Sequence, residues 1–318
     1  MPKNVLVTGG AGFIGGHVAQ AYLNRGDRVW VLDDLSTGKR ENIPDRAEFV
    51  EASIESKIVG DLFDKVGGFD LVNHHAAQID VRVSVLDPAR DARSNVLGFL
   101  NVLENAQRCG TRRFIFVSSG GVVYGEPEER PTPEIAPKLP LSPYGVTKLT
   151  AEYYLYYYHR VHGLDYVALR YANVYGPRQD PHGEAGVVAI FSSRILAGQT
   201  ITVYGDGEQT RDYVFVEDVV RANLMLSDAA LAPGNSLDDR AFNVGTGVET
   251  SVNRLADLLI KQSGRETKCI HGPERRGELR HSCLSTARLK SLGWDARQGI
   301  ESGLKTTFDY IASKEQGR

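Results

Sequence analysis

The stretch that decides the fold is Thr8-Gly9-Gly10-Ala11-Gly12-Phe13-Ile14-Gly15. It directly follows a short apolar run at 5–7 and opens a helical pattern over 13–25. Glycines at these spacings allow a tight turn, let a pyrophosphate approach the backbone, and let helix and strand pack closely. The helix N-terminus then faces the anionic phosphates. The stretch therefore predicts a strand–turn–helix unit that binds a dinucleotide, rather than a glycine-rich turn without a ligand.

The first half of the chain alternates between short apolar runs and longer helical patterns, which is typical of a parallel sheet with helices on both faces. From about residue 176 the alternation is lost, and loops, short strands and scattered helices follow. We expect an α/β fold with a Rossmann-type doubly wound parallel sheet and a smaller α+β region on its C-terminal side. The strands are expected at 5–7, 28–32, 48–51, 69–73, 113–117 and 166–169, with helices at 13–25, 87–108 and 144–162.

Composition is ordinary for a globular protein. The 318 residues carry a formal net charge of −3 and are 42% apolar, so neither nucleic acid nor an anionic membrane is expected as a partner. The cysteines, Cys109, Cys269 and Cys283, lack metal-ligand spacing, so we expect no metal and a reducing compartment. The N-terminus shows no signal peptide, and no apolar run reaches the ~20 residues of a membrane span. We expect a cytoplasmic protein.

An acidic residue lies where the second strand is expected to end. The carboxylate of Asp33 can accept hydrogen bonds from the adenosine ribose hydroxyls and would repel a 2′-phosphate. With Asp34 beside it, this favours NAD over NADP as the cofactor. The cations Lys39 and Arg40 nearby work against that preference.

Tyr144 and Lys148 stand four residues apart where a helix is expected to begin, so they lie on one helix face. A nearby positive charge favours the phenolate and lowers the pKa of a tyrosine, which makes Tyr144 a candidate base. Ser118 and Ser119 end the fifth strand, where a hydroxyl points into the ligand crevice of an open α/β sheet. Ser119 can hydrogen-bond a substrate oxygen and share its proton with Tyr144. The alternatives without a catalytic role are a surface helix pair for Tyr144 and Lys148 and a strand-end cap for Ser119.

Together these motifs make the chain resemble the extended short-chain dehydrogenase/reductase superfamily. Within it, the chain is most similar to the NAD-dependent nucleotide-sugar epimerases, of the UDP-glucose 4-epimerase kind. Nearly the whole chain carries the resemblance, in order. The motifs are T-G-G-A-G-F-I-G at 8–15, D-D-L-S-T-G-K at 33–39, H-A-A-Q at 75–78, S-S-G-G-V-V-Y-G at 118–125, S-P-Y-G-V-T-K at 142–148, L-R-Y-A-N-V-Y-G-P at 169–177, G-D-G-E-Q-T-R-D-Y-V at 205–214 and R-R-G-E-L-R-H-S at 275–282.

The resemblance implies two sets of site residues and two domains. The Rossmann domain would comprise 1–172 with returning segments near 214–244, and the nucleotide-sugar domain 173–213 and 245–318. NAD would be bound by Gly9, Gly12, Phe13, Ile14, Asp33, Leu35, Ser36, Thr37, Gly38, Ser53, Ile54, Ala76, Ala77, Gln78, Asn95, Ser118, Tyr144, Lys148 and Tyr171. The UDP-sugar would contact Ser119, Gly120, Tyr144, Asn173, Val187, Val188, Tyr204, Arg211, Arg275, Glu278 and Ser282.

Some of these residues have particular roles in the resembling family. Tyr204 would stack near uracil, Arg211 and Arg275 would clamp the diphosphate, and Glu278 would accept from the uridine ribose. Planar guanidinium groups suit phosphates because they donate in pairs.

Two positions depart from the family pattern. Ser53-Ile54 stands at the end of the third strand, where family members usually have Asp-Ile or Asp-Val, and Gln78 stands where many epimerases have lysine. Both departures lie on the cofactor side, and neither removes a catalytic group.

The resemblance also implies the reaction. Relatives begin by removing the sugar 4-hydroxyl proton while hydride leaves C4 for NAD. Dehydratases and decarboxylases place an acid after the strand-end serine, whereas this chain has Gly120-Gly121. We therefore expect 4-epimerisation of UDP-glucose/UDP-galactose through a 4-keto intermediate. The small Ser282 should also admit the N-acetyl group of UDP-GlcNAc/UDP-GalNAc. A UDP-glucuronate 4-epimerase or decarboxylase and a non-enzymatic dinucleotide sensor are the alternatives.

Five tyrosines on the expected helix 144–162 are too many for one helix face to bury. They are Tyr153, Tyr154, Tyr156, Tyr157 and Tyr158. Because family members dimerise through two helices from each subunit, we expect a homodimer formed through helices near 87–108 and 144–162. Packing of these rings within one subunit is the alternative.

Overall fold

The computed structural model describes residues 2–181, 186–274 and 279–316. The chain forms two compact units, each built from several segments. The first comprises Met1–Val123, Lys138–Arg170 and Val220–Phe242, and the second comprises Tyr124–Pro137, Tyr171–Val219 and Asn243–Arg318.

The first unit is built on a seven-stranded sheet with the order β10-β6-β5-β4-β1-β2-β3. The pairs β1–β2, β2–β3, β1–β4 and β4–β5 are parallel, which confirms the expected α/β fold. The strands are β1 (Asn4–Thr8), β2 (Arg28–Asp33), β3 (Glu48–Glu51), β4 (Leu71–His74), β5 (Arg113–Ser119), β6 (Tyr166–Tyr171) and β10 (Ala241–Val244).

Strand β1 lies inside the sheet, with β4 on one side and β2 on the other, so the strand order reverses there. Open α/β sheets bind their ligands at such a reversal, outside the carboxyl ends of the strands. The run Val5, Leu6 and Val7 is fully buried, as expected for a strand covered on both faces. The glycine stretch therefore leaves the sheet at its binding edge.

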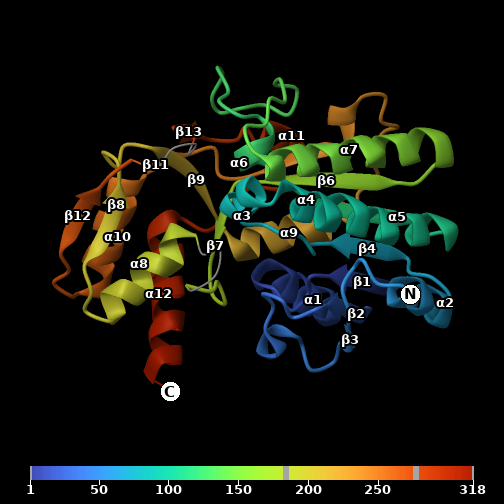
Figure 1. The fold of residues 1–318 in the computed structure, drawn as a ribbon, viewed down its shortest axis with the longest axis horizontal. Helices are drawn as coiled ribbons and strands as arrows, with labels where there is room; N and C mark the ends of the chain where they lie inside the picture. Colours follow the sequence, from blue (N-terminus) through green and yellow to red (C-terminus); the bar gives the residue numbers. More distant parts are fainter. Residues whose placement is uncertain (1, 182–185, 275–278, 317–318) are drawn as a thin grey trace. The chain divides into compact units, whose positions relative to one another are not determined.

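Helices flank this sheet, and α7 packs beside α3 and α4 (Figure 1). They are α1 (Phe13–Arg25), α2 (Ile58–Val66), α3 (Val81–Leu86), α4 (Pro88–Ala92), α5 (Phe99–Arg108), α6 (Gly120–Val123), α7 (Pro143–His162) and α9 (Val216–Leu226). Helix α1 has the bounds predicted from the sequence. The helix expected over 87–108 is present as α4 and α5, joined by a π-helical turn at Arg93–Gly98.

Helix α3 was not foreseen. It begins after Asp80, whose carboxylate accepts from the backbone N–H groups of Arg82 and Val83 and so caps the helix.

The π-helical turn ends at Gly98, where an added Cβ would lie 2.8 Å from Cγ1 of Ile54. Single π-helical turns are rare and are often found at functional sites, and this one carries Asn95.

The second unit is the smaller α+β region that the sequence predicts. Strand β9 (Thr210–Phe215) pairs with β11 (Glu249–Ser251), β13 (His281–Ser282) and β7 (Asn173–Tyr175), while β8 (Ile201–Tyr204) pairs with β12 (Cys269–Gly272). Helices α8 (Val187–Leu196), α10 (Val252–Ser263) and α12 (Ile300–Gln316) pack together, and α11 (Ala287–Ser291) is short. Their shared core contains Phe191, Leu255 and Leu304.

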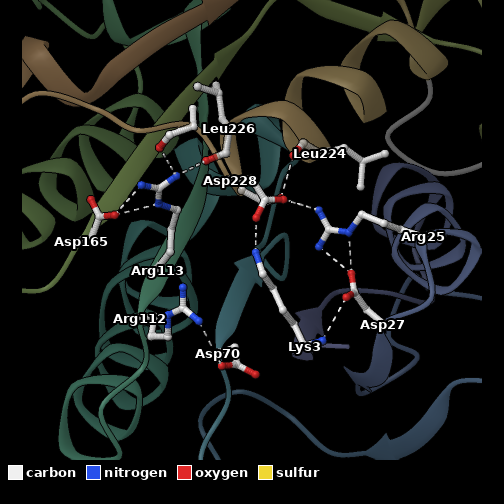
Figure 2. Close-up of polar contacts among 12 residues, drawn as sticks. Lys3, Arg25, Asp27, Asp70, Arg112, Arg113, Asp165, Leu224, Leu226 and Asp228 are labelled. Carbon is white, nitrogen blue, oxygen red and sulfur yellow. Dashed lines mark hydrogen bonds and ion pairs between the residues drawn. The ribbon is translucent and has the colours of Figure 1, made fainter. Parts of the chain in front are cut away.

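A network of ion pairs holds the end of α9 at the amino edge of the first unit's sheet, opposite the glycine stretch (Figure 2). Arg113, the first residue of β5, donates to the carbonyls of Leu226 at 2.6 Å and Ala229 at 2.8 Å. It also binds Asp165 at 2.5 Å. Asp228 is paired with Lys3 and with Arg25. The carbonyl of Leu226, the last residue of α9, which lacks a partner within the helix, thus accepts from a cation.

Within the described part of the chain, none of the helices combines the length and the apolar character needed to cross a bilayer.

Candidate active site

The glycine stretch forms a tight turn directly above the end of β4. Gly9 has φ +67°, and an added Cβ would lie 2.6 Å from the backbone nitrogen of Ala76. An added Cβ on Gly15 would lie 2.2 Å from the carbonyl oxygen of Gly9. Gly12 is the N-cap of α1 and has no side chain that caps it. Gly9 thus allows the left-handed turn, Gly12 leaves the helix N-terminus without a side chain, and Gly15 allows the close packing, as the sequence indicates.

Asp33 ends β2 and is largely buried. Its carboxylate accepts from the backbone N–H groups of Ala11 at 3.0 Å and Leu35 at 2.9 Å. Burial raises the pKa of Asp33, and these two donors oppose that rise. An added Cβ on Gly38 would lie 2.7 Å from Oδ1 of Asp33, so the segment after β2 folds back closely onto this carboxylate.

These features fit the adenosine end of NAD. A Cβ on Gly9 or Gly12 would fill the turn in which the backbone is bare, and the Asp33 carboxylate lies beside that turn. A neighbouring buried atom, Nε2 of His75, has no hydrogen-bond partner among the residues that the structure describes. The residues expected on the same segments, Phe13, Ile14, Ser36 and Thr37, stay predictions for this contact.

The segment after β4 is fixed by reciprocal hydrogen bonds. The backbone N–H of Gln78 donates to Oδ1 of Asn95, and Nδ2 of Asn95 donates to the carbonyl of Gln78, both at 2.8 Å. The side chain of Gln78 donates to Asp91 at 2.9 Å and to the carbonyl of Asp80 at 3.1 Å. Gln78, one of the two predicted departures from the family pattern, therefore fixes the backbone of the segment that carries Ala76 and Ala77.

The other departure, at the end of β3, has a local role as well. The hydroxyl of Ser53 accepts from the backbone N–H of Glu55 at 3.2 Å, and Ile54 is buried in the core. Their contact with the cofactor stays a prediction.

Tyr144 lies in the first turn of α7 and is half-buried. Ser142 caps this helix by accepting from the backbone N–H of Gly145 at 3.2 Å, and Pro143 occupies the first helical position. The backbone N–H of Tyr144 donates to the hydroxyl of Ser84 at 3.2 Å. The tyrosine is therefore held by a fixed helix end rather than by a loop.

Lys148 is buried one turn further along α7. Its Nζ donates to the carbonyl of Val117 at 2.8 Å and lies 5.7 Å from the centre of the Tyr144 ring. Burial lowers the pKa of Lys148 to about 8, while the charges of Asp91 and Glu152 oppose this. The lysine is therefore still mostly protonated at neutral pH. The structure brings Tyr144 and Lys148 together on one helix face, as the spacing predicts.

The two serines at the end of β5 have different environments. Ser119 is the last residue of the strand and is half-buried, next to Gly120 and Gly121 at the start of α6. Ser118 is buried, and its hydroxyl donates to Oε1 of Glu152 at 2.5 Å. The proton of Ser118 is thus used inside the protein, and a cofactor contact from this residue stays a prediction.

The second unit contains the other residues expected to bind the sugar nucleotide, apart from Ser119, Gly120 and Tyr144 of the first unit. Arg211 in β9 stands in register with Ser282 in β13, so these two predicted residues are direct neighbours on adjacent strands. Ser282 is buried, with 5% of its surface exposed. Tyr204 ends β8, and Asn173 begins β7 and is exposed.

The remaining predicted residues have varied settings. Val188 lies in the apolar core of the second unit, and Val187 is partly buried beside it. Tyr171 is buried at the end of β6. Arg275 and Glu278 lie outside the described residues.

Sequence reasoning missed three buried carboxylates that organise these residues. Asp91 accepts from Gln78, Asn95 and Thr147, whose hydroxyl is 2.7 Å away. Asp212, next to Arg211, accepts from the backbone N–H groups of residues 246, 247 and 284. Glu152 lies four residues after Lys148, and this repeated spacing of four along one helix face was the available signal.

These features describe a dinucleotide-binding α/β enzyme with a tyrosine–lysine pair. A model of the NAD dependent epimerase/dehydratase family matches residues 5–245. The chain belongs to this family.

Its relatives are similar over their full length. A UDP-glucose 4-epimerase of Mycolicibacterium smegmatis is 44% identical over 319 residues, which cover 98% of this chain and 99% of that protein. The structure of UDP-glucose 4-epimerase from Thermotoga maritima with UDP-glucose is 46% identical, with a TM-score of 0.93 and coverage of 98% and 99% of the two chains. The Thermus thermophilus enzyme in complex with NAD is 42% identical, with a TM-score of 0.90 and coverage of 97% and 98%.

Proposed function

We propose that the chain is a UDP-hexose 4-epimerase that interconverts UDP-glucose and UDP-galactose with NAD as its cofactor. The observation that carries this proposal is the half-buried Tyr144 beside the buried ammonium group of Lys148, 5.7 Å from the ring centre. The similarity to UDP-glucose 4-epimerases at 44–46% identity over nearly the whole chain supports the choice of substrate.

In the proposed mechanism, Tyr144 acts as general base toward the 4-hydroxyl of the sugar. The Lys148 ammonium favours the phenolate, and the hydroxyl of Ser119 orients the same sugar oxygen. NAD, when bound, accepts the hydride from C4 and later returns it. The 4-keto sugar rotates within the site, so that the hydride returns to the opposite face of C4. Tyr144 then gives the proton back to the 4-oxygen.

Epimerisation is favoured over elimination by the two residues that come after Ser119 in the chain. These residues, Gly120 and Gly121, carry no side chain that can exchange a proton with C5 or C6. A dehydratase or decarboxylase needs such a group, whereas 4-epimerisation returns the one proton that it removes. UDP-glucuronate remains an alternative substrate, because 4-epimerisation of a uronate needs no further acid.

The second unit supplies residues for the nucleotide in this proposal. Arg211 binds the diphosphate through charge-assisted hydrogen bonds, and Tyr204 lies near the uracil. Ser282, the strand neighbour of Arg211, borders the sugar. Because its side chain is small, we propose that UDP-GlcNAc and UDP-GalNAc are accepted as well. In that case Ser282→Tyr should suppress activity on the N-acetyl sugars and retain activity on UDP-glucose.

We also propose that two copies of the chain associate through the exposed face of α7. Tyr153 is 58% exposed and Tyr157 is 48% exposed, and with Thr150 and Tyr154 they line a shallow apolar hollow. Leu97, on the adjacent π-helical turn, is 61% exposed. Clustered exposed apolar side chains of this kind mark association surfaces.

Light scattering at micromolar concentration tests the association. The wild type should have the mass of a dimer, Tyr157→Glu should lower that mass, and Leu292→Glu, at an exposed leucine of the second unit, should not. A wild type that is monomeric would exclude the association.

Side-by-side NMR assays of the purified protein with UDP-glucose, UDP-GlcNAc and UDP-glucuronate test the activity. We expect UDP-galactose to form from UDP-glucose. Absence of turnover with all three substrates, in protein that contains NAD, would refute the proposed function. Turnover of UDP-glucose without turnover of UDP-GlcNAc would refute only the role given to Ser282.

A further inference from the structure

Two hydrogen bonds connect the end of β5 to α7. Lys148 donates to the carbonyl of Val117 at 2.8 Å, and Ser118 donates to Glu152 at 2.5 Å. The residues involved are consecutive on the strand and one helical turn apart on the helix. The next strand residue is Ser119, and the preceding helical turn carries Tyr144. The two bonds therefore lie directly beside the two groups that act on the substrate oxygen.

Glu152 is itself rigidly held. It is fully buried on α7, and its Oε2 accepts from the guanidinium of Arg170 at 2.6 Å. Arg170, in β6, is fully buried as well and also binds Asp238 at 3.0 Å. A buried ion pair holds its partners at fixed positions because breaking it would leave an unpaired charge in the interior.

Short hydrogen bonds to an ionised acceptor are about twice as strong as neutral ones. The bond from Ser118 to Glu152 belongs to this class, so it resists sliding of the strand end along the helix. Of the two hydrogen bonds between the end of β5 and α7 described above, only the one from Lys148 to the carbonyl of Val117 would then be left.

We propose that Glu152 is a positioning residue for the catalytic pair. Held by Arg170, it binds the Ser118 hydroxyl, fixes the end of β5 against α7, and thereby sets the separation between the hydroxyls of Ser119 and Tyr144. This inference rests on the proposed function for its kinetic consequence, but the separation itself can be measured independently of any substrate.

Glu152 also acts on the charge of Lys148. The lysine is faced by Asp91 from α4, by Glu152 and Tyr144 on its own helix, and by His74 and His75 from the β4 side. Burial lowers the pKa of both histidines, to about 3 for His75, so they are neutral at physiological pH. Replacing Glu152 by glutamine should therefore move the alkaline limb of the pH–rate profile to lower pH.

The decisive variant is Ser118→Ala, because it removes the bond to Glu152 and leaves the Arg170 ion pair in place. We expect kcat on UDP-glucose to fall by ~10- to 100-fold, since small misplacements of reacting groups have effects of this size. KM and the NAD content should change little. Ser118→Thr, which keeps the hydroxyl, should restore most of kcat.

Thr307→Val is the matched control. It removes another fully buried hydroxyl, which donates to the carbonyl of Gly303 at 2.8 Å in α12. We expect its kcat to equal that of the wild type.

Crystal structures of the wild type and Ser118→Ala measure the distance from Oγ of Ser119 to Oη of Tyr144 directly. An unchanged distance, or a Ser118→Ala enzyme with wild-type kcat, would overturn the inference. An inactive wild type would count against the proposed function alone, because the two structures would still decide the positioning.

Discussion

Replacing Gly9 by alanine combines two separable physical effects. Its backbone is left-handed, with φ +67°, which any residue other than glycine adopts at a cost. An added Cβ would also lie 2.6 Å from the nitrogen of Ala76 and 2.8 Å from the carbonyl carbon of His75. Gly198 has the same φ of +67°, but nothing lies within 4 Å of its added Cβ. The pair Gly9→Ala and Gly198→Ala therefore separates backbone strain from overlap.

The magnitudes follow from these distances. Left-handed backbone costs an L-residue about 1–2 kcal/mol, and both variants share this term. Overlap in a packed region adds about 1–3 kcal/mol more for Gly9→Ala alone. The atoms it would strike cannot move aside cheaply, because the N–H groups of His75 and Ala76 both donate to Thr8, at 3.0 and 3.2 Å. Gly9→Ala should thus lose more free energy of unfolding than Gly198→Ala, by the size of the overlap term.

Urea unfolding of both variants and the wild type measures this difference. Thermal unfolding with and without added NAD adds a second test, because a ligand that binds the folded state raises its stability. NAD should stabilise the wild type and Gly198→Ala, and it should stabilise Gly9→Ala much less, since the displaced turn no longer fits the phosphates. Equal losses in the two variants would refute the argument from overlap.

Three further outcomes are expected. Tyr144→Phe should lower kcat on UDP-glucose by ~10²- to 10⁴-fold in the NMR assay, with bound NAD retained, and a smaller change would argue against a tyrosine base. Activity should fall as the pH rises through about 8, where Lys148 loses its proton. Because burial makes that pKa lower in the folded state than in the unfolded one, deprotonation of Lys148 favours folding, and circular dichroism should show no loss of structure from it. Arg113→Leu should lose about 1–3 kcal/mol of stability with unchanged kcat, because the partly buried Arg113 binds Asp165 and the carbonyl of Leu226, the last residue of α9. By contrast, Arg112→Leu, at an exposed pair, should lose under about 1 kcal/mol in urea unfolding.

The parts of the fold that depend on neighbours in sequence could be predicted. The helix after the glycine stretch has the expected bounds, Phe13–Arg25, because its start is set by the turn and its end by Gly26 with φ +96°. The π-helical turn at Arg93–Gly98 was not predicted, and it packs closely against a residue distant in sequence, since an added Cβ on Gly98 would lie 2.8 Å from Cγ1 of Ile54. A helical pattern in the sequence does not distinguish the i→i+4 hydrogen bonds of an α-helix from the i→i+5 bonds of a π-helix.

The candidate site divides in the same way. Tyr144 and Lys148 could be paired from their spacing because both lie on α7. The contact of Arg211 with Ser282 required the register of two short strands that are distant in sequence, and such register is set by tertiary packing. The position of Glu152 could not be predicted from α7 alone, because Glu152 is held by Arg170. That arginine lies on β6, the strand next to β5.

The burial of Lys148 explains why the site depends on so many buried polar groups. The lysine must be buried to reach the carbonyl of Val117 and to lie beside Tyr144, and burial alone lowers its pKa toward neutrality. Two carboxylates oppose this loss of charge, Asp91 and Glu152, and neither is exposed to water.

Each buried carboxylate needs its own donors, because an unpaired buried charge is strongly destabilising. Gln78, Asn95 and Thr147 donate to Asp91, and Ser118 and Arg170 donate to Glu152. Residues that family resemblance assigns to the cofactor thus also help to keep Lys148 charged. A substitution at Gln78 or Asn95 should therefore shift the pH dependence of turnover as well as the affinity for NAD, and the absence of that shift would separate the two roles.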